Sequence, residues 1–250
     1  MHRRVFTALL GFLAFASVAI GCSNGSDPPR VTVSAASSLT SVFQVYSDEI
    51  GADARFSFAG SDQLAAQIEQ GARPDVFASA EPDLLTKLSR QGLVGRPIVF
   101  ARNSLVIAVP EGSKIDSVSD LAQPSLDIVI GAPGVPAGDY AREALDRVPR
   151  QDAILANLRS EEPDAKGIVA KLISGAADAG FVYATDVRAA AADLDAVAIP
   201  ASLQPKILYS IAAVKGSDDP DGARQFIAGL SGDGPGVQLL EGAGFARPAR

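Results

Sequence analysis

Residues 31–50, VTVSAASSLTSVFQVYSDEI, are the stretch that decides the fold. The first six residues are small or β-branched and mostly apolar, a pattern typical of a buried strand. From Ser38 onward, Leu39, Val42, Phe43 and Tyr46 recur at helical spacing and predict an amphipathic helix up to residue 50. A cluster of hydroxyl side chains therefore lies where a strand passes directly into a helix. Such a cluster can cap the helix, supply a nucleophile, or bind a ligand that accepts hydrogen bonds.

The same strand–helix alternation continues along the chain. It predicts strands at 54–60, 74–80, 104–110, 126–133, 179–187, 196–200 and 207–216. Helices are predicted at 62–71, 81–92, 139–148 and 165–175, with two more near the C-terminus around 223–230 and 237–243. This order is typical of an α/β protein with mainly parallel sheets and helices on both faces.

Two of the predicted strands, at 104–110 and 207–216, read as crossings between two lobes. We expect one lobe to comprise residues 31–108 plus 209–250, and the other to comprise residues 109–208. Ligands of such sheets bind outside the carboxyl ends of the strands, which places a binding site in the cleft between the lobes.

The N-terminal segment reads as an export signal. Residues 1–21 combine a basic start with an apolar run, as in a signal peptide. Ala19-Ile20-Gly21-Cys22 resembles a lipobox, so we expect Cys22 to be acylated, with residues 22–30 as a polar tether. The expected location is extracytoplasmic, in the periplasm or on the outer face of the membrane. Ordinary secretion with an incidental cysteine is the alternative.

Composition excludes several classes of chemistry. The net charge is −7, and without residues 1–21 the chain has 20 basic and 29 acidic residues, so no basic surface for nucleic acid is expected. The single His lies in the leader and the single Cys is Cys22. His-dependent catalytic triads, His metal sites and intrachain disulfides are therefore excluded from the exported part.

Three loops lead from a strand into a helix start, where unpaired N–H groups and the helix dipole favour anions. They contain Ser38, Ser61 and the Gly/Pro-rich run 131–140. For each Ser taken alone, a helix cap is the preferred interpretation, and Asp62 and Asp139 can also cap their helices.

Five stretches, in their order and spacing, resemble the substrate-binding proteins of molybdate ABC transporters: SAASSLTS, SFAGSDQLAAQIEQGARPDVFASA, NSLVIAVP, GAPGVPAGDYAREAL and AGFVYATD. The likeness spans nearly all of residues 31–248. It implies a two-lobed, type II periplasmic-binding-protein fold that is not an enzyme, needs no cofactor, and delivers molybdate or tungstate to a membrane permease. We expect a monomer.

The resemblance also implies the residues of the oxyanion site. Carried over by motif, they are the hydroxyls of Ser38, Ser61 and Tyr183 and the backbone N–H groups of Ala137 and Ala165. The family often has a run of serines where this chain reads Gly60-Ser61-Asp62. A carboxylate turned inward there would repel a dianion, so we expect Asp62 to point outward and cap its helix.

The chemistry of the ligand agrees with a site made of donors. Molybdate and tungstate at neutral pH carry no proton, so all their oxygens only accept hydrogen bonds. Phosphate often keeps a proton and then requires an acceptor, and leaving it unpaired costs on the order of a few kcal/mol. Sulfate differs from molybdate only in size, so a sulfate- or phosphate-type receptor stays an alternative. Acidic surface residues such as Glu81 and Asp83 are candidates for docking on the permease, or are simply a solvated helix start.

A serine hydrolase is the alternative from a different class. Its base would be a lysine, from a stock consisting of Lys87, Lys114, Lys166, Lys171, Lys206 and Lys215. No lysine stands three residues after any serine, so the Ser-x-x-Lys spacing of such enzymes is missing.

Overall fold

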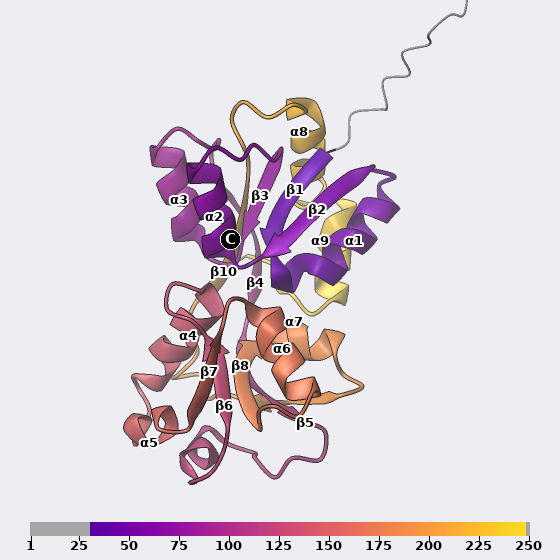
Figure 1. Ribbon diagram of the computed structural model, residues 1–250. Coiled ribbons are helices and arrows are strands. Elements are labelled where there is room, and N and C mark those ends of the chain that lie inside the picture. The colour runs from indigo at the N-terminus through magenta and orange to yellow at the C-terminus, as the bar shows by residue number, and fades with distance from the viewer. Residues whose placement is uncertain (1–30, 249–250) are drawn as a thin grey trace, which may run out of the picture.

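Two five-stranded sheets, each covered by helices, form two lobes joined at a narrow waist (Figure 1). The computed structural model describes residues 31–248. The predicted signal peptide, Cys22 and the tether lie outside the described residues. Within residues 31–248, no helix has both the length and the apolar character needed to cross a membrane.

The first sheet has the strand order β2-β1-β3-β10-β4. Its strands are β1 (Val31–Ala36), β2 (Ala54–Ala59), β3 (Val76–Ser79), β4 (Ile98–Asn103) and β10 (Ile207–Ala213). Its helices are α1 (Thr40–Glu49), α2 (Ser61–Glu69), α3 (Pro82–Arg90), α8 (Pro220–Ala228) and α9 (Pro235–Gly242). Strands β1, β2 and β3 pair in parallel, and β10 is antiparallel to both of its neighbours. Four of the five strands therefore point the same way.

The second sheet repeats this pattern in the order β7-β6-β8-β5-β9. Its strands are β5 (Leu105–Pro110), β6 (Ile128–Gly131), β7 (Leu158–Glu162), β8 (Ala179–Tyr183) and β9 (Leu194–Ala198). Its helices are α4 (Pro136–Leu145), α5 (Gln151–Leu155), α6 (Ala165–Ile173) and α7 (Ala184–Ala189). Here β5 is the antiparallel strand in the fourth position. The expected fold class, with mainly parallel sheets and helices on both faces, is confirmed.

The chain passes between the lobes at Ser104 and again between β9 and β10. All of β5 pairs with β8 and β9, so residues 105–108, which we expected in the first lobe, belong to the second sheet. Likewise β10 enters the first sheet at Ile207. The side chain of Gln204 links the two crossings, accepting from Leu105 N at 3.1 Å and donating to Leu105 O at 2.7 Å. This paired contact marks the hinge.

The sequence analysis did not predict two edge strands and extended a third strand too far, in each case for a physical reason. Strand β7 reads LRSEE and lies at a sheet edge, so its charged side chains hide the apolar alternation of a strand. Strand β4 is also an edge strand, and its first two residues are exposed. Residues 184–187 were predicted to continue a strand, but they form the start of α7. Asp186 accepts the Tyr183 N–H at 3.1 Å and thereby supports a helix start there.

The core of the first lobe shows why residues 40–49 form a helix against the sheet. Phe43 and Tyr46 are fully buried and contact the ring of Phe226 edge-on, at centroid distances of 5.5 and 5.0 Å. Tyr46 Oη also donates to Phe226 O at 2.8 Å. Burial of these rings holds α1 against α8 and fixes the short 3-10 turn, Ser37–Leu39, at the waist.

Candidate functional site

A small pocket lies between the lobes, at the carboxyl ends of strands from both sheets. The five predicted site residues, Ser38, Ser61, Ala137, Ala165 and Tyr183, all line it, together with Ala36, Ser37, Ala59, Gly60, Ala80, Val135, Pro136 and Asp164. Residues more than 140 positions apart in the chain thus meet in one place, as expected for ligand sites of α/β sheets. None of the residues that line this small pocket is Lys or Arg.

Ser61 is held as a hydrogen-bond donor toward the pocket. It is 2% exposed, and its Oγ accepts the backbone N–H of Ala80 at 3.1 Å. The hydroxyl proton is therefore free to be donated to something else. Ser61 begins α2 without making a side-chain cap bond, so the capping alternative does not describe it.

Ser38 is part of a short relay of hydrogen bonds. Its Oγ lies 2.8 Å from Tyr209 Oη, and Tyr209 Oη accepts from Asn103 Nδ2 at 3.4 Å. When Tyr209 donates its proton to Ser38, the Ser38 hydroxyl can donate in turn to a ligand. Burial raises the pKa of Tyr209 well above its usual value, so this phenol keeps its proton.

Tyr183 supplies the third hydroxyl. Its side chain is 2% exposed, and its buried Oη has no hydrogen-bond partner. Leaving a buried hydroxyl unpaired costs about 1–3 kcal/mol, so this donor is available to a ligand in the pocket. Burial raises the pKa of Tyr183 well above its ordinary value, so the group acts as a neutral donor.

Two helix starts complete the set of donors. Ala137 is the second residue of α4 and Ala165 is the first of α6, and both are buried at the pocket. In the first turn of a helix, backbone N–H groups have no carbonyl partner within the helix. The approach of α4 depends on Gly138, because a Cβ on that residue would overlap the carbonyl of Gly131 at the end of β6. Only glycine lets the helix start lie this close to the strand.

Three carboxylates, Asp62, Asp139 and Asp164, lie at or near the pocket. Asp164 lines the pocket, yet its Oδ1 caps α6 by accepting Gly167 N at 2.9 Å. Asp139 Oδ1 accepts Gly134 N at 3.0 Å, outside the small pocket. Asp62 does not line the pocket, but the expectation that it points outward and caps α2 is wrong: its Oδ1 is buried without a partner, and no side-chain bond caps the helix. Burial, reinforced by Asp139 and Asp164, raises the pKa of Asp62.

The pocket is small. Its volume is about 10 Å³, room for about one water molecule. Tyr140 Oη, from α4, donates across the waist to Ala80 O at 3.2 Å, and Ala80 in turn contacts Ser61. Admission of anything larger than water therefore requires the lobes to move apart at the hinge.

Three contributors at the waist were not found from the sequence: Tyr209, Asn103 and Tyr140. Tyr209 sits within an apolar strand, where a tyrosine reads as core. It reaches Ser38 because β10 pairs with β3, which in turn pairs with β1. Within residues 31–248, no group of three or more His, Cys, Asp or Glu side chains is arranged to hold a metal ion.

Comparisons with known proteins agree on one family. The family model described as "Bacterial extracellular solute-binding protein" matches residues 31–246. The molybdate-binding protein ModA of Mycobacterium tuberculosis is 37% identical over 226 residues, covering 87% of this chain and 85% of that protein. A putative ABC transporter substrate-binding lipoprotein of Bacillus subtilis, YvgL, is 28% identical and covers 95% of both chains. The periplasmic molybdate-binding protein of Azotobacter vinelandii has the same fold, with a TM-score of 0.78, 24% identity, and coverage of 88% of this chain and 100% of that one. The protein belongs to the family of bacterial extracellular solute-binding proteins, whose members are transport receptors and not enzymes.

Proposed function

We propose that this protein is an extracytoplasmic receptor for molybdate, and also for tungstate, that supplies an ABC transporter. The observation that carries the proposal is the unpartnered hydroxyl of Tyr183, which lines the same pocket as Ser38, Ser61 and two helix starts. Each of these groups donates a hydrogen bond. A tetrahedral dianion whose oxygens only accept is the matching ligand, and ModA relatives support that choice.

The site distinguishes between oxyanions by two physical means. A monoprotonated phosphate needs an acceptor, and the one carboxylate that lines the pocket, Asp164, directs its Oδ1 to Gly167 N at the start of α6. Sulfate needs no acceptor, so only the separation of the lobes in the closed state selects against it. The bound oxyanion itself is the whole ligand, and the proposed mechanism uses no further cofactor.

Closure is the proposed mechanism of capture. Ser38 and Ser61 come from the first lobe, whereas Ala137, Ala165 and Tyr183 come from the second. An oxyanion contacts all five donors only when both lobes meet around it, so binding stabilises the closed state. The permease then meets a receptor whose two lobes are held in one relative orientation. Glu81 and Asp83, at the start of α3, are the proposed acidic docking residues.

The test is thermal unfolding of residues 23–250, which contain the complete described fold, with and without molybdate, tungstate, sulfate and phosphate. Ligand at about a thousand times its Kd adds roughly 4 kcal/mol to the native state. For a chain of this size, the unfolding temperature should rise by roughly 8–16 °C with molybdate or tungstate. Sulfate and phosphate should give much smaller shifts. A larger shift with sulfate or phosphate, or none with any of the four, would overturn the proposal.

We also propose that Cys22 carries a lipid anchor, as its lipobox-like surroundings and the lipoprotein among its relatives suggest. The variant Cys22→Ala should appear in the soluble fraction outside the cytoplasm, whereas the unaltered protein should sediment with membranes. Cell fractionation followed by immunoblotting measures this distribution. Equal membrane retention of both proteins would count against acylation at this position.

A further inference from the structure

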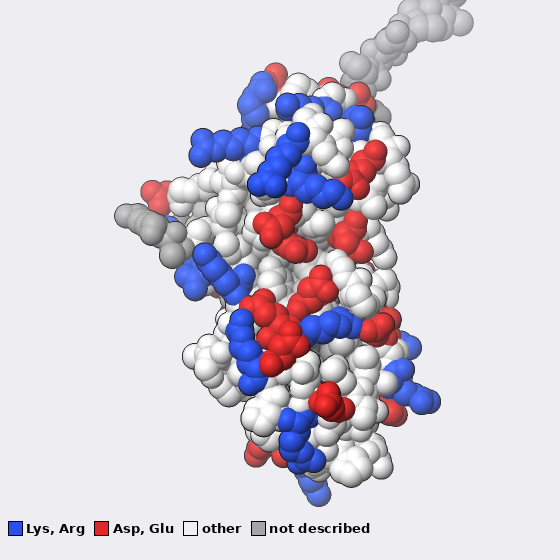
Figure 2. Space-filling view, turned by 90° about the vertical axis from the view of Figure 1, so that its left-hand side faces the viewer, with Lys and Arg blue, Asp and Glu red and all other residues white. Residues whose placement is uncertain are grey.

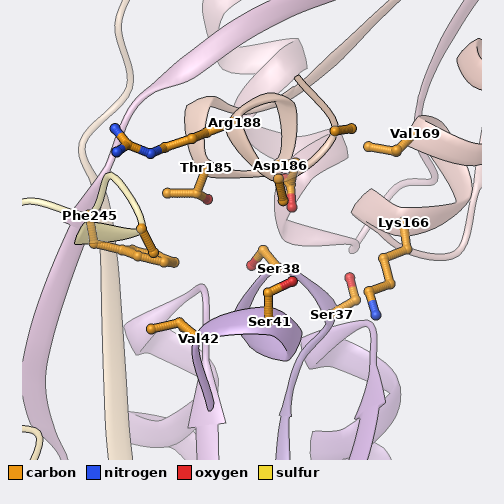
Figure 3. Close-up of a pocket in the computed structure, with 13 residues that line it drawn as sticks. Ser37, Ser38, Ser41, Val42, Lys166, Val169, Thr185, Asp186, Arg188 and Phe245 are labelled. Atoms are coloured by element: carbon orange, nitrogen blue, oxygen red, sulfur yellow. The ribbon is translucent and has the colours of Figure 1, made fainter. Parts of the chain in front are cut away.

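A second, wider pocket of about 380 Å³ adjoins the small pocket on the side of α1, α6 and α7. Ser37 and Ser38 line both pockets, so the two spaces meet at the 3-10 turn that follows β1. Figure 3 shows this wide pocket between the lobes, with Ser37, Ser38, Ser41 and Val42 on one wall and Lys166, Thr185, Asp186 and Arg188 on the other. Phe245, from the C-terminal segment, closes one end.

The wide pocket contains the positive charge that the small pocket lacks. Lys166 and Arg188 line it, both are exposed, and within residues 31–248 neither forms an ion pair. Lys166 Nζ lies 5.6 Å from the ring centroid of Phe58, which belongs to the other lobe. In Figure 3 its amino group extends toward Ser37, next to the small pocket. This cation–π contact holds the ammonium at the boundary between the lobes.

The opposite side of the small pocket is acidic. Burial and the neighbouring charges of Asp139, Asp83 and Asp62 raise the pKa of Glu81, so carboxylates from both lobes stand close together there. In Figure 2, which looks at the side of α2, α3 and α4, acidic side chains gather above and below the hollow at the waist. A dianion that approached from this side would meet a repulsive field.

We propose that the wide pocket is the access route by which the oxyanion reaches the small pocket, drawn in by Lys166 and Arg188. This inference rests on the proposed function. The protein as a whole is acidic and repels anions at long range, but at a Debye length of about 10 Å two nearby cations govern the last steps of approach. Attraction at this point accelerates association more than it strengthens final binding, since the five donors alone hold the bound ion.

The charge test measures association and dissociation rates for molybdate by stopped-flow fluorescence at low and high salt. The variant Lys166→Gln/Arg188→Gln should lower kon by roughly five- to tenfold at low ionic strength, and by much less at 0.5 M salt. Its koff should change less than twofold. The matched control Arg90→Gln/Lys215→Gln also removes two exposed cations, but from outside both pockets, and should leave kon within about twofold.

A second test narrows the wide pocket with a bulky side chain, to determine whether the oxyanion passes through it. Ala189 is an exposed residue of α7 that lines the wide pocket, and Ala189→Trp would narrow it. If the ion passes there, kon and koff should fall by similar factors, so that Kd stays nearly the same. The control Ala170→Trp, at an exposed position of α6 outside both pockets, should change neither rate.

The outcomes separate the route from the function. Absence of molybdate binding by the unaltered protein in an equilibrium titration would overturn the proposed function. Normal equilibrium binding, with rates in the charge and tryptophan variants that match those of their controls, would overturn the access route alone. A rise in kon for Glu81→Gln/Asp83→Asn, without any fall in the Lys166 and Arg188 variants, would place the route on the acidic side instead.

Discussion

Replacing Tyr183 with phenylalanine is expected to weaken molybdate binding and, in the same protein, to raise the unfolding temperature. The hydroxyl is buried and unpaired in the protein, so its removal relieves a desolvation penalty on the order of 1 kcal/mol. The bound dianion, in contrast, loses a hydrogen bond to a charged acceptor, which is worth about 1.5–3 kcal/mol. We therefore expect Kd to rise by roughly 10- to 100-fold while Tm without ligand rises by about 2–4 °C.

Tyr46→Phe is the matched control. Tyr46 is also fully buried, but its hydroxyl donates to Phe226 O at 2.8 Å, far from the small pocket. Its removal leaves that carbonyl unpaired and should lower Tm without changing Kd. Isothermal titration measures Kd, and thermal unfolding measures Tm, for each of the two variants. A lower Tm together with unchanged affinity for Tyr183→Phe would mean that the hydroxyl serves the fold and not the ligand.

The second large effect concerns Asp186 and pH. This carboxyl is 8% exposed, and burial raises its pKa to about 7, although it accepts the N–H of Tyr183 and lies near Lys166. In the unfolded chain the same group ionises near its ordinary pKa of 3.8. Between these two values the native state binds more protons than the unfolded state. The free energy of unfolding therefore falls as pH rises from about 4 to about 7, and the contribution of this group is lost above that range.

Asp186→Asn removes this dependence while its amide oxygen can still accept the N–H of Tyr183. The free energy of unfolding of the variant, relative to the unaltered protein, should increase steadily from pH 4 to pH 7 and then level off. The shift in pKa corresponds to a total change of at most about 4 kcal/mol. Urea unfolding at several pH values measures it, and Asp48→Asn, on the exposed face of α1, controls for the loss of one surface charge. A constant difference across this pH range would show that Asp186 is not held neutral by burial.

The same carboxyl bears on ligand binding, because it lines the wide pocket beside Ser37 and Ser38. Once ionised, it adds a negative charge near the path and the site of a dianion. Molybdate affinity should therefore decline as pH rises through about 7 in the unaltered protein, and should decline less in Asp186→Asn.

Local sequence patterns were sufficient for much of this protein. The alternation of apolar runs with period 2 and period 3.6 predicted the α/β class and most of the helices and strands, because burial of one face is a local requirement on sequence. The resemblance to the molybdate-binding family, and not local periodicity, implied Ser38, Ser61, Ala137, Ala165 and Tyr183, which the structure brings to one small pocket. The hydroxyls of Ser38, Ser61 and Tyr183 are donors by residue type, which is a property of the sequence. The backbone N–H groups of Ala137 and Ala165 are available because these residues begin helices.

Tertiary structure decided what depends on contacts between distant segments. The Ser38–Tyr209–Asn103 relay requires β10 to pair with β4. No local sequence pattern in these two strands predicts that pairing. The charged edge strand β7 forms because β6 offers it a partner, against its own composition. The way in which the two lobes meet decides three features of the site. It decides whether Asp62 lies in the pocket, whether the Tyr183 hydroxyl is paired, and on which side Lys166 and Arg188 lie. The relative placement of the lobes depends on hinge geometry and on packing between residues more than a hundred positions apart. Local sequence patterns therefore cannot predict it.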